Sequence, residues 1–188
     1  MKCFRAYLLE DVAVTTDLPQ IFLDMDETIV DWLNPANKAL LAKGLPKWND
    51  PSWKKYSDKE ADKIRWSVLN DIPDFWETLP FTSDGKQIWN FVKKYRPKIL
   101  SACGPLAKNC QIGKKKWIDK HLERSKLSGI HFVRRSEKKN FAKIDGAPGV
   151  LIDDYIKNCE EYVTAGGYAI QATTATSVIS KLKRLGFR

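Results

Sequence analysis

The chain has 188 residues, of which 43% are hydrophobic and 29% charged, and its formal net charge is +9. This length suits one domain with a small insertion, and the composition excludes a disordered chain. No apolar run reaches the ~18–20 residues of a membrane span, and the N-terminal residues lack the pattern of a secretory signal. We therefore expect a cytoplasmic protein with no membrane partner, and the basic charge favours anionic partners such as nucleotides, phosphosugars or polynucleotides.

Residues 1–19 form an N-terminal extension, in which CFRAYLL fits either a strand or a short helix. After it, short apolar runs predict buried strands at 20–26, 98–103, 129–133, 149–153 and 168–172. Helical patterns fall between them and after them, at about 84–95, 105–122, 158–164 and 175–185. This alternation predicts an α/β fold, a Rossmann-like parallel sheet with helices on both faces.

Residues 34–80 interrupt the alternation, because helices follow one another there without a strand. Asn34-Pro35 opens a helix that Gly44 stops, and Ser57 with Glu60 forms a capping box that starts another. Five of the seven tryptophans lie in or beside this stretch, at positions 32, 48, 53, 66 and 76. We interpret residues 34–80 as a helical cap, inserted into a core made of 20–33 and 81–188. The alternative is a helical elaboration that only packs on the sheet.

Polar residues stand at the ends of three predicted strands, where open α/β sheets bind their ligands. Asp24 and Asp26 end the first, Ser101 lies near the end of the second, and Asp153-Asp154 ends the fourth. Side chains two apart on a strand point the same way, so Asp24 and Asp26 can face one site. Four carboxylates gathered there repel one another unless a cation lies between them, and oxygen ligands suit Mg²⁺.

Other reactive side chains receive structural interpretations. The cysteines (Cys3, Cys103, Cys110 and Cys159) show no CxxC spacing and no partner histidines. They indicate neither a zinc site nor a disulfide framework, and we expect small core residues. We expect Lys114–Lys116 to form a solvated helix face, with a nucleic-acid role as the alternative, and His121 and His131 to be structural or surface residues.

The segment IFLDMDETIV resembles the first signature of the haloacid dehalogenase-like (HAD) phosphatase superfamily, hydrophobic residues followed by DxDxT. Ser101 at the end of KILSAC is similar to the second signature, and VLIDD to the fourth. The resemblance covers about residues 20–172. It implies that Asp24 is the nucleophile that forms an aspartyl-phosphate, and that Asp26 protonates the leaving alkoxide and then activates water.

The same resemblance implies the remaining roles. Ser101 would hold a phosphate oxygen through its hydroxyl. Asp154, with Asp24 and the backbone carbonyl of Asp26, would bind Mg²⁺, while Asp153 would ligate more weakly or through water.

The family also has a lysine that balances charge on the phosphoryl group. Three candidates lie in RRSEKKNFAKIDGAPGVLIDD, namely Lys138, Lys139 and Lys143. Lys138 is preferred because it comes just after the third strand, where the family places this residue. Lys143 is next, since its shorter spacing to the fourth signature occurs in some relatives.

A finer resemblance links DMDETIVDW, DFWETLPF and LIDDYIKN to the 5'(3')-deoxyribonucleotidase branch. Phe75 and Trp76 match that branch's aromatic pair, and Trp32 stands where it has phenylalanine. The match implies that Phe75 and Trp76 bind substrate beside Ser101 and Ala102, with stacking on a base; the alternative is that they belong to the core of the cap. Glu27-Thr28 and the segment SACG depart from the branch.

The preferred function is therefore a Mg²⁺-dependent phosphomonoester hydrolase acting on a small molecule, most specifically a nucleoside monophosphate. One alternative is a phosphatase of the same mechanism that works on polynucleotide ends, which the charge of +9 would assist. Another is a non-catalytic, basic nucleic-acid-binding protein on the same fold. Nucleic acid is the less favoured partner.

Overall fold

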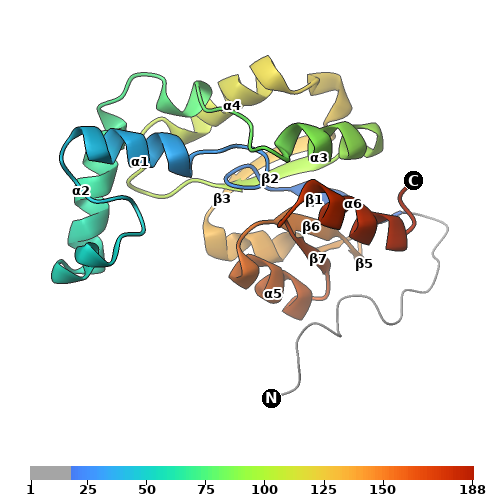
Figure 1. Ribbon diagram of the computed structural model, residues 1–188. Coiled ribbons are helices and arrows are strands. Elements are labelled where there is room, and N and C mark those ends of the chain that lie inside the picture. The colour runs from blue at the N-terminus through green and yellow to red at the C-terminus, as the bar shows by residue number, and fades with distance from the viewer. Residues whose placement is uncertain (1–17) are drawn as a thin grey trace.

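A computed structural model describes residues 18–188, so the prediction for the N-terminal extension lies almost wholly outside the described residues. Its main sheet has the order β3-β2-β1-β6-β7, and every pairing in it is parallel (Figure 1). The predicted parallel α/β fold is confirmed. The strands are β1 (Ile21–Leu23), β2 (Lys98–Ala102), β3 (Gly129–Val133), β6 (Val150–Asp153) and β7 (Tyr168–Gln171).

Helices cover both faces of this sheet (Figure 1). The covering helices are α3 (Gly85–Val92), α4 (Cys110–His121), α5 (Ile156–Thr164) and α6 (Ala175–Arg184), whereas α1 (Leu33–Ala42) and α2 (Asp58–Asn70) lie to one side of the sheet (Figure 1). Side chains alternate along each strand, so Ile21 and Leu23 enter one apolar core and Phe22 enters the other. The first core lies under α3, α4 and α6, and the second lies under α5 and the 3₁₀ helix η5 (Arg135–Phe141).

The turn after β1 ends the strand earlier than the sequence pattern suggests. The carbonyl of Met25 accepts hydrogen bonds from the amides of three residues, Thr28, Ile29 and Val30. Glu27 has a left-handed backbone with φ of 52°, and its carboxylate accepts the amides of Trp32 and Leu33 at the start of α1. A carboxylate at this point satisfies amides that no helical carbonyl can reach.

Residues 34–80 contribute no strand to the main sheet. They hold α1, the 3₁₀ helices η1 (Pro51–Lys55) and η2 (Phe75–Glu77), and α2, which begins at the predicted Ser57–Glu60 capping box. Outgoing and returning chain lie side by side, since the amide of Asp31 bonds the carbonyl of Pro80 at 3.0 Å. We call residues 34–80 the helical insertion. Three of its tryptophans, Trp48, Trp66 and Trp76, cluster with Trp32, which lies just before it: Trp32, Trp48 and Trp66 contact one another and Trp76 contacts Trp66, with ring centroids 4.9–6.3 Å apart.

Smaller elements complete the described chain. The 3₁₀ helices η3 (Lys93–Tyr95) and η4 (Arg124–Lys126) follow α3 and α4. A short antiparallel hairpin, which the sequence analysis did not predict, joins β4 (Lys143–Ile144) to β5 (Ala147–Pro148). Among residues 18–188, no helix has the length and apolar character needed to cross a membrane.

The expectation of unpaired cysteines is wrong for two of the four. Cys103 and Cys110 form a disulfide, with Cα atoms 5.9 Å apart, across the loop between β2 and α4. The chain reverses in this loop, so cysteines seven positions apart meet without any CxxC pattern. Cys159 is a buried free thiol, and Cys3 lies outside the described residues.

Candidate active site

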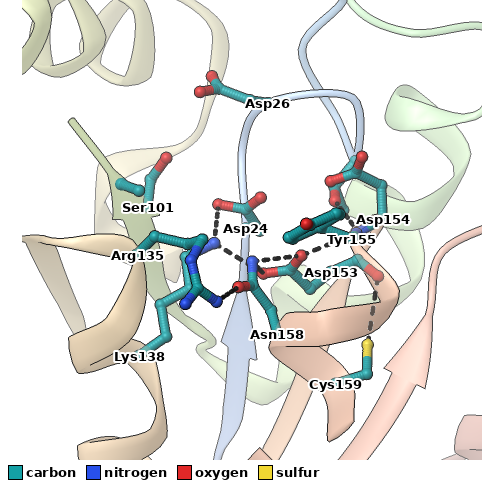
Figure 2. A network of polar contacts seen from close by, with 12 residues as sticks. Asp24, Asp26, Ser101, Arg135, Lys138, Asp153, Asp154, Tyr155, Asn158 and Cys159 are labelled. Carbon is teal, nitrogen blue, oxygen red and sulfur yellow. Dashed lines mark hydrogen bonds and ion pairs between the residues drawn. The ribbon is translucent and has the colours of Figure 1, made fainter. Parts of the chain in front are cut away.

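Three carboxylates converge at the carboxyl ends of the central strands (Figure 2). Asp24 follows β1, Asp153 ends the neighbouring β6, and Asp154 comes next in the chain. The parallel register fixes their proximity, because the amide of Asp24 donates to the carbonyl of Ile152 at 3.0 Å. One carboxylate oxygen from each residue lies within 4.8 Å of the others. Asp24 is 4% exposed and Asp153 is fully buried, so water screens their repulsion poorly.

A buried lysine neutralises part of this charge. Lys138, on η5, places its ammonium 2.8 Å from Asp24 Oδ1 and 2.7 Å from Asp153 Oδ2 (Figure 2). Burial opposes ionisation, yet the attraction of Asp24 and Asp153 raises the pKa of Lys138 above its ordinary value. Of the three candidate lysines, the structure brings Lys138 to the site. Lys139 and Lys143 are exposed.

Asp153 is held rigidly by neighbours on α5. Its Oδ1 accepts the amide of Tyr155 at 3.0 Å and the side chain of Asn158 at 2.9 Å, and its Oδ2 faces Lys138. Asn158 is itself held by Arg135 on η5 (Figure 2). Both oxygens of Asp153 therefore have protein partners, which suits a carboxylate that positions its neighbours or reaches a cation through water.

Asp154 has a different environment. Its amide donates to Thr28 Oγ1 at 3.1 Å, so the turn after β1 fixes the start of this segment. Burial first, and then the charges of Asp24 and Asp153, raise the pKa of Asp154 to about 7. Thr28 is one of the departures from the nucleotidase pattern, and the structure gives it this positioning contact.

The donor set tests whether a divalent cation fits. Buried oxygens Oδ1 of Asp24 and Oδ1 of Asp26 accept no hydrogen bond, although the former is an ion-pair partner of Lys138. The carboxylate oxygens of Asp24, Asp153 and Asp154 lie close together, and their repulsion contributes to the raised pKa of Asp154. A hard divalent cation bound there would offset this repulsion. Asp24 and Asp154 fit Mg²⁺ as direct ligands.

Asp26 does not join the three clustered carboxylates. Its carboxylate lies apart from them, on the side of Ser101 (Figure 2). Instead, Asp26 Oδ2 forms an ion pair with Lys114 Nζ at 2.7 Å. Burial raises the pKa of Asp26, and Lys114 opposes that rise. A carboxyl with a raised pKa is suited to hold and release a proton.

Lys114 is a site residue that the sequence analysis missed. The expectation of a solvated face is wrong for Lys114, which is 1% exposed, whereas Lys115 and Lys116 are exposed. Besides Asp26, its ammonium bonds Ser101 Oγ at 3.0 Å and the carbonyl of Ala102 at 2.8 Å. A signal was present: Cys110, Trp117 and Ile118 are the buried face of α4, and Lys114 falls on that face by helical spacing.

The predicted aromatic pair is largely enclosed. Phe75 and Trp76 are each 6% exposed, and the Trp76 ring stacks on Trp66. Lys114 Nζ lies 5.0 Å from the centre of the Trp76 ring, which connects this ring to Asp26 and Ser101. Close approach depends on Gly113, where an added Cβ would lie 2.5 Å from Trp76 Cβ. The pair thus packs between the insertion and α4, beside the site.

The two histidines lie away from the acidic cluster. His121 packs on Phe81 and Trp117, and His131 packs on Phe141. Partial burial lowers the pKa of both imidazoles.

Comparisons with known proteins place this arrangement in a known fold. No family model matches the sequence, and no curated protein matches it. Solved structures share its fold. The HAD-hydrolase YfnB from Bacillus subtilis, bound to magnesium, matches with a TM-score of 0.56 and 13% identity, over 82% of this chain and 86% of that chain. The haloacid dehalogenase-like protein SP0104 from Streptococcus pneumoniae matches with a TM-score of 0.55 and 13% identity, over 89% and 92%.

L-2-haloacid dehalogenase from Xanthobacter autotrophicus also matches, with a TM-score of 0.54 and 11% identity, over 82% of this chain and 77% of that chain. The chain has the fold of the HAD-superfamily hydrolases. Because one of these structures is a dehalogenase, the fold alone does not choose the reaction or the substrate.

Proposed function

We propose that this protein is a Mg²⁺-dependent phosphomonoester hydrolase that works through an aspartyl-phosphate on Asp24. The observation that carries the proposal is the position of the Asp24 carboxylate. It lies between the ammonium of Lys138, at 2.8 Å, and the carboxylate of Asp154, within 4.8 Å. A phosphate ester brought there meets a nucleophile, a fixed cation and a site for a second cation.

Four side chains supply the groups that a phosphoryl transfer needs. Asp24 attacks phosphorus, the P–O bond to the alcohol breaks, and Asp26 donates a proton to the leaving alkoxide. Asp26 then takes a proton from the water that hydrolyses the aspartyl-phosphate. Ser101 and Lys138 hold non-bridging oxygens of the phosphoryl group.

A Mg²⁺ ion held by Asp24, Asp154 and the carbonyl of Asp26 would neutralise charge on the phosphate. Lys114 adds a second protein cation. Its ammonium bonds both Asp26 and Ser101, the proton donor and an oxygen-binding residue. It therefore fixes the distance between the leaving-group side and the oxygen-binding side of the site.

We further propose a nucleoside monophosphate as substrate, with deoxyribonucleotides preferred. The resemblance of three segments to the deoxyribonucleotidase branch supports this choice. The aromatic pair adds support, since Trp76 lies against Lys114 and the insertion brings further tryptophans nearby. Because the Trp76 ring is 6% exposed and already stacks on Trp66, a base would meet its exposed edge in an edge-to-face contact while the phosphate reaches Asp24. We place this activity in the cytoplasm.

A polynucleotide end is the second candidate substrate, and the distribution of charge favours it. Residues 85–145 contain 17 lysines and arginines but only 4 acidic residues, a net charge of +13, whereas the whole chain carries +9. This segment includes α3, β2, α4, β3 and η5, and therefore two of the five strands of the main sheet and two site lysines. Such a surface would neutralise backbone phosphates and make binding salt-dependent.

One panel of phosphate esters tests both candidates. Release of phosphate from 5'- and 3'-mononucleotides, a 3'-phosphorylated oligonucleotide and sugar phosphates is measured with Mg²⁺ and with chelator. We expect Mg²⁺-dependent turnover of mononucleotides, lost in Asp24→Asn and retained in Asp119→Asn, which changes an exposed carboxylate on α4. Equal turnover of sugar phosphates would overturn the nucleotide assignment, and full activity of Asp24→Asn would overturn the mechanism. Turnover confined to the oligonucleotide, and lost as salt is added, would favour the second candidate.

A further inference from the structure

The Cys103–Cys110 disulfide closes the loop that joins two parts of the candidate site. Cys103 directly follows the last residue of β2, and Cys110 is the first residue of α4. Ser101 lies just before the disulfide in the chain, and Lys114 lies one turn after it. None of the chemical steps proposed above uses this bond.

The disulfide and Lys114 span the same loop in parallel. The Lys114 ammonium bonds Ser101 Oγ and the carbonyl of Ala102, which are on the strand side of the loop. The disulfide joins the next residue, Cys103, to the helix four positions before Lys114. The covalent tie therefore holds the first turn of α4 at the distance from β2 that the Lys114 contacts require.

The helical insertion is also hydrogen-bonded to this loop. Asn70, the last residue of α2, donates from Nδ2 to the carbonyl of Leu106 at 2.9 Å. Its Oδ1 accepts the amide of Lys108, also at 2.9 Å. This pair of hydrogen bonds requires one particular backbone shape between the two cysteines. Changing that shape would affect the insertion as well as Lys114.

Cys103 is the more exposed residue of the pair. Cys103 is half-buried, and the residues that follow it, Gly104 to Leu106, are exposed, whereas Cys110 is 3% exposed. The remaining described cysteine, Cys159, packs in the core on the opposite face of the sheet and cannot exchange with the pair. In a reducing compartment, a disulfide that a thiol can reach is exchanged rather than permanent.

We propose that Cys103 and Cys110 form a thiol–disulfide switch that sets the affinity of the site for a phosphate group. A small dithiol supplies the electrons. Its thiolate attacks Cys103 Sγ, the S–S bond breaks, and Cys110 leaves as a thiolate that takes up a proton. The second thiol of the reductant then attacks its own sulfur in the mixed disulfide, and Cys103 leaves and is protonated. Two electrons and two protons reach the protein, and the reductant ends as a cyclic disulfide.

Reduction frees the loop while leaving every site residue chemically unchanged. The reduced loop samples more shapes, and only a fraction of them align Lys114 with Ser101 and Asp26. Substrate binding must then select that fraction, which raises KM and the dissociation constant of phosphate. The chemical step, carried by Asp24, changes much less. This inference rests on the proposed phosphatase function.

The test compares the full-length protein in its oxidised and dithiothreitol-reduced forms. Thiol counting first establishes how many cysteines each form contains. Binding of inorganic phosphate in the presence of Mg²⁺ is then measured by calorimetry, and KM and kcat by mononucleotide hydrolysis. We expect reduction to weaken phosphate binding roughly tenfold and to raise KM by a similar factor, with kcat changed less than threefold.

Two variants assign the effect to this pair. Cys103→Ser should bind phosphate as weakly as the reduced protein and should no longer respond to dithiothreitol. Cys3→Ser, which removes a cysteine outside the described residues, should keep the full response. An equal dissociation constant in the two forms of the unmodified protein would overturn the switch, and so would a response that survives Cys103→Ser. If nucleotides are hydrolysed equally in both forms, only the switch is wrong; if neither form hydrolyses them, the phosphatase proposal itself is wrong.

Discussion

Replacing Lys114 with methionine tests the most unexpected contact in the site. Lys114 is 1% exposed and its ammonium bonds three acceptors; methionine keeps most of the length of the side chain and removes the ammonium. Removing one partner of a buried ion pair costs about 3–5 kcal/mol. The Asp26 side chain, however, is 26% exposed and regains some hydration, so we expect the unfolding free energy to fall by about 2 kcal/mol.

This loss is large enough to measure in two ways. For a chain of this size, a change of about 2 kcal/mol lowers the melting temperature by about 4–8 °C. The value of kcat/KM should fall about 100-fold, because a cation beside the phosphate-binding Ser101 is lost. Lys115→Met is the matched control, since Lys115 is the next residue on α4 and is exposed. It should stay within about 0.5 kcal/mol of the parent protein.

A double variant separates charge from packing. In Lys114→Met, the unpaired carboxylate of Asp26 causes most of the instability, so adding Asp26→Asn should recover about half of the lost melting temperature. Activity should not recover, because the proton donor is now missing. The reasoning is refuted if Lys114→Met melts and turns over like the parent protein. It is also refuted if the double variant is no more stable than Lys114→Met.

Hydrogen bonding, protonation and aromatic packing at the site give three further predictions. Thr28→Val removes the acceptor of the Asp154 amide, so the unfolding free energy should fall by about 1–2 kcal/mol. The Mg²⁺ concentration at the midpoint of a thermal-shift titration should also rise, and an unchanged titration would contradict the contact. Because the pKa of Asp154 is raised to about 7, its folded form holds a proton that the unfolded carboxyl, with an ordinary value of 3.8, has released. Stability of the metal-free protein should therefore fall as the pH rises from about 4 to about 7 and level off above that, in a melting series that Asp154→Asn flattens. Leucine at Phe75 and Trp76 should raise KM for mononucleotides more than it lowers kcat; an equal loss with glycerol phosphate would argue against base stacking.

The parallel α/β arrangement and the converging carboxylates were predictable because both depend on local patterns. Each central strand is a short apolar run that ends in polar residues, and parallel strands place such ends at one edge. Strand lengths were less predictable. The run at 20–26 indicates a longer strand than β1, because the pattern does not show that Met25 starts a turn.

The missed features depend on contacts between segments. Spacing alone leaves Lys138 and Lys143 as competitors, since η5 is a 3₁₀ helix and its geometry decides which lysine faces Asp24. The disulfide depends on the shape of a loop, which no residue pattern reports. The β4–β5 hairpin did have a signal: Asp145 and Gly146, both with positive φ, form the dipeptide that tight hairpin turns favour.

The neck of the helical insertion has an evolutionary consequence. Chain leaves the core at Asp31 and returns at Pro80, and these residues are hydrogen-bonded to each other, while the amide of Thr82 bonds the carbonyl of Ile29. Insertions of very different length can be accommodated at this point, because the backbone hydrogen bonds already hold the two ends of the insertion next to each other. The insertion can therefore change in length and sequence while the aspartates at the ends of β1 and β6 keep their geometry.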